Sequence, residues 1–173
     1  MEDFKLLENI ESLGEKYQAT YDAVKSRMLK TYEAKAPGKS IAFVGINPPV
    51  GQYSLKELYD YCVKNYPYPG YLMCVEQNTP GGKIRPHLHI AHPVSENTRK
   101  NHIIARLAKL FHLDQNSIDV SVSKSSLVIS RWVKYIHGEK KEEKKDNVEK
   151  DIKDREYYNI PHIYENGVLT WSG

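Results

Sequence analysis

Two histidines separated by a single residue, His87 and His89, have the spacing best suited to chemistry in this 173-residue chain. They lie in the segment 85–92, Arg-Pro-His-Leu-His-Ile-Ala-His, whose alternation of polar and apolar residues predicts a β-strand. Alternate side chains of a strand leave the same face, about 7 Å apart along the backbone, so the two imidazoles could chelate one divalent ion. His92 falls outside this alternation and is a weaker third candidate.

A site of this kind needs an oxygen ligand if it is to hold Mg²⁺ or Mn²⁺. Glu76 belongs to an otherwise apolar predicted strand at 70–78, which the turn sequence Asn-Thr-Pro-Gly-Gly-Lys joins to the histidine strand as an antiparallel hairpin. Its side chain shares a face with Cys74, and the hairpin register, which the sequence does not fix, decides whether that is the histidine face. We predict a metal site of Glu76 and both histidines; the alternative is that the histidines are merely half-buried polar residues.

A candidate nucleophile, Tyr135, lies in the segment 132–140, where a helix is predicted. A phenol with a pKa near 10 is a poor nucleophile at neutral pH, and it must be aimed at a phosphorus whose charge a metal has partly neutralised. A helical tyrosine facing a metal-bearing sheet meets that need. The pair Tyr157 and Tyr158 competes with it, but this pair follows a charged run and is expected to pack against the terminal strands.

The main domain that positions these residues is predicted at 40–173. Its elements are expected at 40–49 (strand), 54–66 (helix), 70–78 and 85–93 (strands), 95–111 (helix), 117–123 (a strand or the first of a pair) and 131–136 (helix). The order β-α-β-β-α-β is that of ferredoxin-like and RRM-like folds of the α+β class, whose antiparallel sheet carries both helices on one face and leaves the other free. The charge run 138–156 indicates a solvated C-terminal helix, and Glu165-Asn166-Gly167 suggests a terminal hairpin.

The flanking element is predicted at 1–39. Residues 3–33 place apolar side chains at spacings of three and four, which is typical of a long amphipathic helix, and Pro37 and Gly38 then form a linker. This helix is expected to dock on the main domain, with pairing to a second copy as a short coiled coil the alternative route to a homo-oligomer.

Length and composition exclude several classes of protein. A chain of 173 residues has room for one domain and a flanking element, but not for a large motor or multidomain enzyme. No uncharged apolar stretch is long enough to cross a membrane, and the first residues are acidic, so the expected location is intracellular. Cys62 and Cys74 lack CxxC spacing and are expected to be buried, reduced thiols, while a net charge of +3 permits a nucleic-acid partner without demanding one.

Three segments together resemble the HUH endonuclease superfamily, in particular the Rep initiators of circular single-stranded DNA viruses and related rolling-circle plasmids. Residues 41–49, Ile-Ala-Phe-Val-Gly-Ile-Asn-Pro-Pro, occupy the place of the first family motif; Glu76 with 86–90, Pro-His-Leu-His-Ile, the metal-binding second; and 132–140 the tyrosine-bearing third. The resemblance implies metal-dependent nicking and joining of single-stranded or hairpin origin DNA through a 5′-phosphotyrosine. It also implies action where DNA is replicated, the host nucleus for a eukaryotic virus, and a helicase domain outside this chain, since no Walker motif occurs here.

The lysine of the third motif departs from the family. Many Rep proteins have Tyr-x-x-Lys, but the third residue after Tyr135 is Gly138, and the following lysines are Lys140, Lys141 and Lys144. Tyrosine and Lys140 do not share a face of a regular helix, whereas a break at the glycine would let Lys140 swing back. Lys140 is therefore the predicted partner in DNA positioning or proton transfer; the alternative is that all three lysines belong to a solvated charge run.

Other functions fit the sequence less well. An RRM-like binding module has the same element order but needs stacking aromatics on its first and third strands, where only Phe43 is available. A histidine-dependent nucleotide hydrolase or transferase would need HxHxH, which Ala91 interrupts, and a relaxase or transposase of the HUH superfamily is a nearer alternative. His102 and His112 are expected to be structural, and the candidate DNA contacts are His137, His162, Lys83, Arg85, Arg99, Lys100, Lys124, Arg131 and Lys134.

Overall fold

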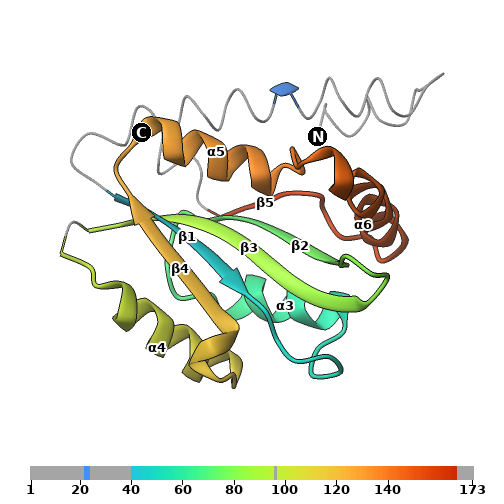
Figure 1. The fold of residues 1–173 in the computed structure, drawn as a ribbon. Coiled ribbons are helices and arrows are strands. Elements are labelled where there is room, and N and C mark those ends of the chain that lie inside the picture. Colours follow the sequence, from blue (N-terminus) through green and yellow to red (C-terminus); the bar gives the residue numbers. More distant parts are fainter. Residues whose placement is uncertain (1–21, 24–39, 96, 167–173) are drawn as a thin grey trace.

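The computed structural model describes residues 22–23, 40–95 and 97–166, which form an α+β structure with a five-stranded antiparallel sheet and four α-helices (Figure 1). Residues 22 and 23 are helical, and the rest of the predicted N-terminal helix and linker lies outside the described residues, as does the far side of the predicted terminal hairpin. Within the described ranges no helix is long and apolar enough to span a bilayer.

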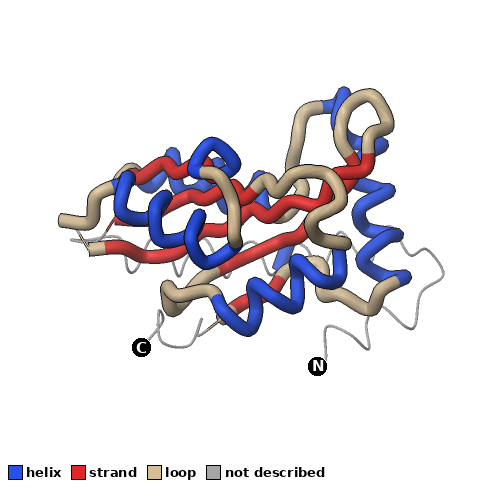
Figure 2. Tube along the Cα trace, turned by 90° about the horizontal axis from the view of Figure 1, so that it is seen from below, coloured by secondary structure: helices blue, strands red, loops and turns tan. Residues whose placement is uncertain are grey.

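The sheet has the strand order β4-β1-β3-β2-β5, and every neighbouring pair is antiparallel. In Figure 2 the strands, drawn red, lie side by side in one layer. The elements are β1 (Ser40–Ile46), α3 (Leu55–Asn65), β2 (Leu72–Asn78), β3 (Ile84–Val94), α4 (Lys100–Phe111), β4 (Ile118–Ser123), α5 (Ser126–Ile136), α6 (Lys145–Tyr157) and β5 (Tyr164–Glu165). Up to β4 this is the predicted β-α-β-β-α-β order, and it is compatible with a ferredoxin-like fold.

Local sequence signals set the boundaries of the elements next to the site. Ser54 and Glu57 form a capping box that starts α3. Gly81 and Gly82 both have positive φ, which lets the turn between β2 and β3 close tightly. Helix α5 begins at Ser126, capped by Ser125, five residues before the predicted start, because the serine side chain accepts a hydrogen bond from the Val128 amide.

The second face of the sheet is covered, which corrects the expectation of a free face. Helices α3 and α4 pack on one face, over a core that includes Val44, Leu88 and Ile90. On the other face α5 buries Ile129, Val133 and Ile136 against Ile41, Leu72, Cys74 and Ala91, and it lies across the sheet in Figure 1. Those strand residues are apolar, so their burial under α5 stabilises the fold through the hydrophobic effect.

Helix α6 is not simply a solvated charged helix, as its sequence suggested. Asp151 and Arg155 are buried at the edge of β2. Strand β5 pairs only with Leu72 and Met73, so the later backbone groups of β2 have no strand partner on that side among the described residues. The carboxylate of Asp151 accepts hydrogen bonds from the backbone amides of Gln77 and Asn78, and Arg155 donates to the carbonyl of Val75. These charged side chains therefore supply the hydrogen-bond partners that a neighbouring strand would otherwise provide.

Candidate metal centre and tyrosine site

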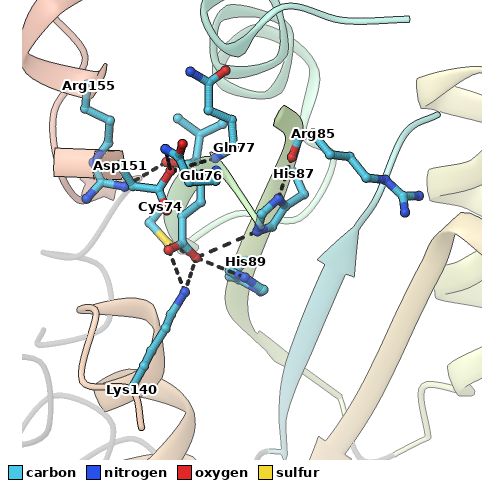
Figure 3. Close-up of polar contacts among 11 residues, drawn as sticks. Cys74, Glu76, Gln77, Arg85, His87, His89, Lys140, Asp151 and Arg155 are labelled. Atoms are coloured by element: carbon cyan, nitrogen blue, oxygen red, sulfur yellow. Dashed lines mark hydrogen bonds and ion pairs between the residues drawn. The ribbon is translucent and has the colours of Figure 1, made fainter. Parts of the chain in front are cut away.

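The hairpin register puts Glu76 on the histidine face. Glu76 pairs with His87 across the β2–β3 ladder, and Cys74 pairs with His89. Paired residues of an antiparallel ladder project their side chains to the same side, so the carboxylate and both imidazoles converge (Figure 3). Their ligand atoms lie within 4.8 Å of one another, and the cluster could hold a metal ion.

The imidazoles are oriented as metal ligands would be. Nδ1 of His87 lies 2.7 Å from the carbonyl oxygen of Arg85, so Nδ1 carries the proton and Nε2 keeps its lone pair. The Nε2 atoms of His87 and His89 lie 4.0 and 3.1 Å from the same carboxylate oxygen, Oε1 of Glu76. Nε2 of His89 is buried, and within the described part of the chain it makes no hydrogen bond of acceptable geometry. A buried, unbonded nitrogen facing a shared carboxylate fits a chelating site.

The electrostatics favour the protonation states that a metal needs. Burial alone would raise the pKa of Glu76, but the close contact with the His89 imidazole and the ammonium of Lys140 outweigh it and hold that pKa well below its usual range. Burial, followed by repulsion from His89, lowers the pKa of His87 to about 4. At neutral pH Glu76 is therefore an anion and His87 a neutral base, the forms in which both side chains coordinate cations.

Lys140 reaches the same carboxylate. Its Nζ lies 2.6 and 2.5 Å from Oε1 and Oε2 of Glu76, and its side chain is only 8% exposed, so it is not part of a solvated charge run. The chain turns back because Gly138, just after α5, has a φ of +86°, in the left-handed region that favours glycine. Burial would lower the pKa of Lys140, but the neighbouring carboxylate raises it above its ordinary value, so the ammonium stays charged.

Tyr135 projects from α5 toward the histidines. Its ring meets that of His89 edge to face, with the ring centres 5.0 Å apart. Phe43 of β1 lies between Trp132 and His89, nearly parallel to both, at centroid distances of 5.4 and 6.2 Å. Trp132 thus packs α5 onto the sheet, and the aromatic row limits how the tyrosine and the His89 ring can turn.

A cavity of about 80 Å³ adjoins this tyrosine. Its walls include Tyr135, His87, Lys140 and Lys144, and it is completed by Asn78, Thr79, Pro80, Asn147, Val148 and Asp151. The ammonium groups of Lys140 and Lys144 lie 4.6 and 5.7 Å from the centre of the tyrosine ring. The cavity is therefore lined by the predicted nucleophile, by one predicted metal ligand, His87, and by the two lysines.

The sequence missed the part of the site that α6 supplies. The β2–β3 ladder has an irregularity between Glu76 and Asn78, and Asp151 holds that point with three hydrogen bonds from Gln77 and Asn78. The carboxylate of Asp154 accepts two more hydrogen bonds, from the side-chain amides of Gln77 and Asn78. The available signal was weak: aspartates at 151 and 154 and Arg155 share one face of a helix, a spacing that a solvated helix has as well.

The remaining candidates lie away from this cluster or are engaged elsewhere. His92 is buried on the opposite face, where it stacks on Tyr68. His137 is buried and bonded to the carbonyl of Val133, and Arg85 donates to the carbonyls of Asn47 and Pro48. Tyr157 and Tyr158 do not pack as predicted; they are 82% and 45% exposed and contact each other. Exposed side chains are found at Lys83, Arg99, Lys100, His102, His112, Lys124, Arg131 and Lys141, whereas Lys134 and His162 are partly buried.

Comparison of the chain with protein-family models, curated proteins and solved structures gives no match. The functional argument therefore rests on the site itself: a carboxylate and two imidazoles on one sheet face, a tyrosine beside them and two lysines around that tyrosine.

Proposed function

We propose that the chain is a metal-dependent, single-stranded DNA endonuclease with strand-joining activity, of the HUH type used by Rep initiators of rolling-circle replication. The observation that carries the proposal is the contact between Tyr135 and His89, because it brings a phenol to the face on which the ligand trio converges. The ferredoxin-like arrangement of the first four strands supports it as well, since that is the fold the resemblance implies.

Each residue has a role in this reaction. Glu76, His87 and His89 would hold Mg²⁺ or Mn²⁺, which neutralises part of the charge on the phosphodiester. Tyr135 attacks the phosphorus, the bond from phosphorus to the 3′ oxygen breaks, and the phenolic proton ends on the 3′ hydroxyl that is released. The 5′ end stays bound as a phosphotyrosine, so attack by a 3′ hydroxyl reverses the reaction and joins strands without ATP. Lys140 keeps Glu76 ionised and in place.

The RRM-like alternative is disfavoured by what covers the sheet. Such a module binds bases by stacking them on exposed aromatics of its central strands. Phe43 is the aromatic that could do this, but it lies between Trp132 and His89, and α5 packs over the same face. Origin DNA, single-stranded or as a hairpin, is the proposed partner, with a helicase domain on another polypeptide or segment, and the site of DNA replication is the proposed location.

The proposal is tested by incubating the protein with a pool of labelled single-stranded DNAs, with and without Mn²⁺, and resolving covalent adducts on denaturing gels. The wild-type protein should form an adduct that needs the metal, and Tyr135→Phe should form none. Tyr157→Phe and Tyr158→Phe are matched controls, because both tyrosines are exposed and contact each other, and they should react normally. An adduct that survives Tyr135→Phe would move the nucleophile, and no cleavage of any member of the pool would reject the proposal.

A further inference from the structure

We propose that the cavity beside Tyr135 is a phosphate subsite, and that Lys144, rather than Lys140, is the lysine that contacts the phosphodiester there. The inference rests on the proposed function, because it names the residue that meets the substrate of that reaction. It departs from the spacing of the third motif, in which the lysine three residues after the tyrosine is expected to serve.

Lys140 is committed to another group. Both of its contacts go to the carboxylate of Glu76, and its side chain is 8% exposed, with the carboxylate 4% exposed. Separating such a pair leaves a buried charge unpaired, which is strongly unfavourable. A phosphate that recruited Lys140 would have to meet that cost, so Lys140 is poorly placed to bind substrate.

Lys144 has no such commitment. Its side chain is half-buried, its Nζ lies 5.7 Å from the ring centre of Tyr135, and it lines the same cavity. Among the described residues no carboxylate lies within ion-pair distance of it, whereas its neighbour Lys145 pairs with Glu142. A cation held by an aromatic face at the edge of a cavity can turn to an anion without breaking an ion pair.

The size and lining of the cavity suit one phosphate. A volume of about 80 Å³ is room for a few water molecules, and so for a phosphate group. Lys144 supplies the charge, and the Asn147 side chain adds an amide that can donate. Asp151 also borders the cavity, but its Oδ1 accepts three hydrogen bonds from Gln77 and Asn78, so its charge is directed toward the strand. His87 and Tyr135 form the wall through which a phosphate here meets the nucleophile.

The test compares Lys144→Met with Lys141→Met, which removes the same charge from an exposed position of the same segment. With the nick site mapped on the wild-type protein, single-turnover cleavage should fall by about 10²-fold in Lys144→Met and stay within about twofold in Lys141→Met. Lys144→Arg should recover part of the loss because it keeps the charge. Binding is measured separately in the Tyr135→Phe background, by fluorescence anisotropy of the labelled nick-site oligonucleotide over a range of salt concentrations.

The binding arm separates this inference from the proposed function. Loss of one phosphate contact should reduce the slope of log affinity against log salt by about 0.7 in Lys144→Met relative to Lys141→Met. An oligonucleotide with a neutral methylphosphonate at the nick should bind both variants alike, since the contact is then already absent. Equal slopes and equal cleavage in the two variants would overturn the subsite. A wild-type protein that cleaves nothing would instead reject the proposed function, and the slopes measured on a pool member would still decide whether Lys144 meets a phosphate.

Discussion

The ammonium of Lys140 lies within 2.6 Å of both carboxylate oxygens of Glu76, across 64 positions of the chain. The same carboxylate faces the Nε2 atoms of His87 and His89 through Oε1. Glu76 is therefore shared by the side chains that would bind a metal and by a lysine that supplies a positive charge of its own. A metal ion and the ammonium of Lys140 would not be equivalent partners of Glu76, because the lysine is part of the chain and is always present.

Replacing Lys140 by Met should tighten Mn²⁺ binding by about tenfold, because a fixed positive charge next to the ligand oxygens repels the metal. The same change should lower the melting temperature of the metal-free protein by roughly 5 °C or more, since Glu76 is then buried without its partner. Isothermal titration calorimetry and thermal unfolding measure the two effects.

Lys141→Met controls for the loss of one positive charge from the same segment, and it should change neither quantity, because Lys141 is exposed. Weaker Mn²⁺ binding in Lys140→Met would show that the positioning of Glu76 by the lysine outweighs the repulsion between the ammonium and the metal.

Gly138→Ala should destabilise the protein by about 1–2 kcal/mol, because an alanine strains the left-handed backbone at this position. The added methyl would also lie 3.2 Å from Cγ1 of Val148. Both effects displace the turn that carries Lys140, so the loss should be less than additive with Lys140→Met in a double-mutant cycle of chemical denaturation. Gly45→Ala is the matched control, since its methyl would make only ordinary contacts at 3.5 Å or more. Additive losses in the double-mutant cycle would mean that the turn at Gly138 does not position Lys140.

Most of the sheet and the shared face of His87 and His89 could be predicted from the sequence, because both depend on short-range patterns. Alternation along 85–93 assigned the two histidines to one face, and the Gly81-Gly82 turn required a tight hairpin. The face of Glu76 could not be predicted, since a shift of one residue in the hairpin would move its side chain to the other side. The observed pairing of Glu76 with His87 settles that choice.

The parts that could not be predicted depend on long-range contacts between polar groups. Nothing in the charge run 138–156 distinguishes Asp151, which bonds to the edge of β2, from Glu149, which is exposed on the same helix. Which charges are buried depends on where β5 stops pairing, a property of a segment that follows the helix in the chain. Coverage of the second face by α5 likewise depends on the tertiary fold, because its period predicts an apolar stripe but not the surface that it meets.

Asp151→Ala should weaken Mn²⁺ binding by about 10- to 100-fold, because it releases the end of the strand that carries Glu76. The amides of Gln77 and Asn78 lose their acceptor, so stability should also fall by about 2–3 kcal/mol. Titration calorimetry is done at a temperature at which the variant is folded by circular dichroism. Glu149→Ala, an exposed change on the same helix, should alter neither value, and normal metal binding in folded Asp151→Ala would exclude a positioning role for α6.

His92 should make stability depend on pH without involving the metal site. Burial lowers the pKa of His92 to about 4, against its ordinary 6.5, and its surroundings are the rings of Tyr66 and Tyr68, with Arg106 over the outer face of Tyr68. Between these two pH values the unfolded chain binds one more proton than the folded chain, so the free energy of unfolding rises with pH. This contribution of His92 reaches up to about 3 kcal/mol and is fully present above about pH 6.5.

Replacing His92 by Phe isolates that contribution. The variant keeps a ring against Tyr68 and removes the titrating group, so its urea midpoint should change less between pH 4.5 and 7 than that of the wild-type protein. His112→Phe, at an exposed position, controls for loss of a histidine as such and should retain the wild-type dependence. Equal pH dependence in His92→Phe and wild type would mean that protonation of other groups governs acid unfolding. Nε2 of His92 has no hydrogen bond among the described residues, but Nδ1 lies 3.1 Å from the carbonyl oxygen of Pro93, so the phenylalanine removes that one bond and stability at pH 7 should change by no more than about 1 kcal/mol.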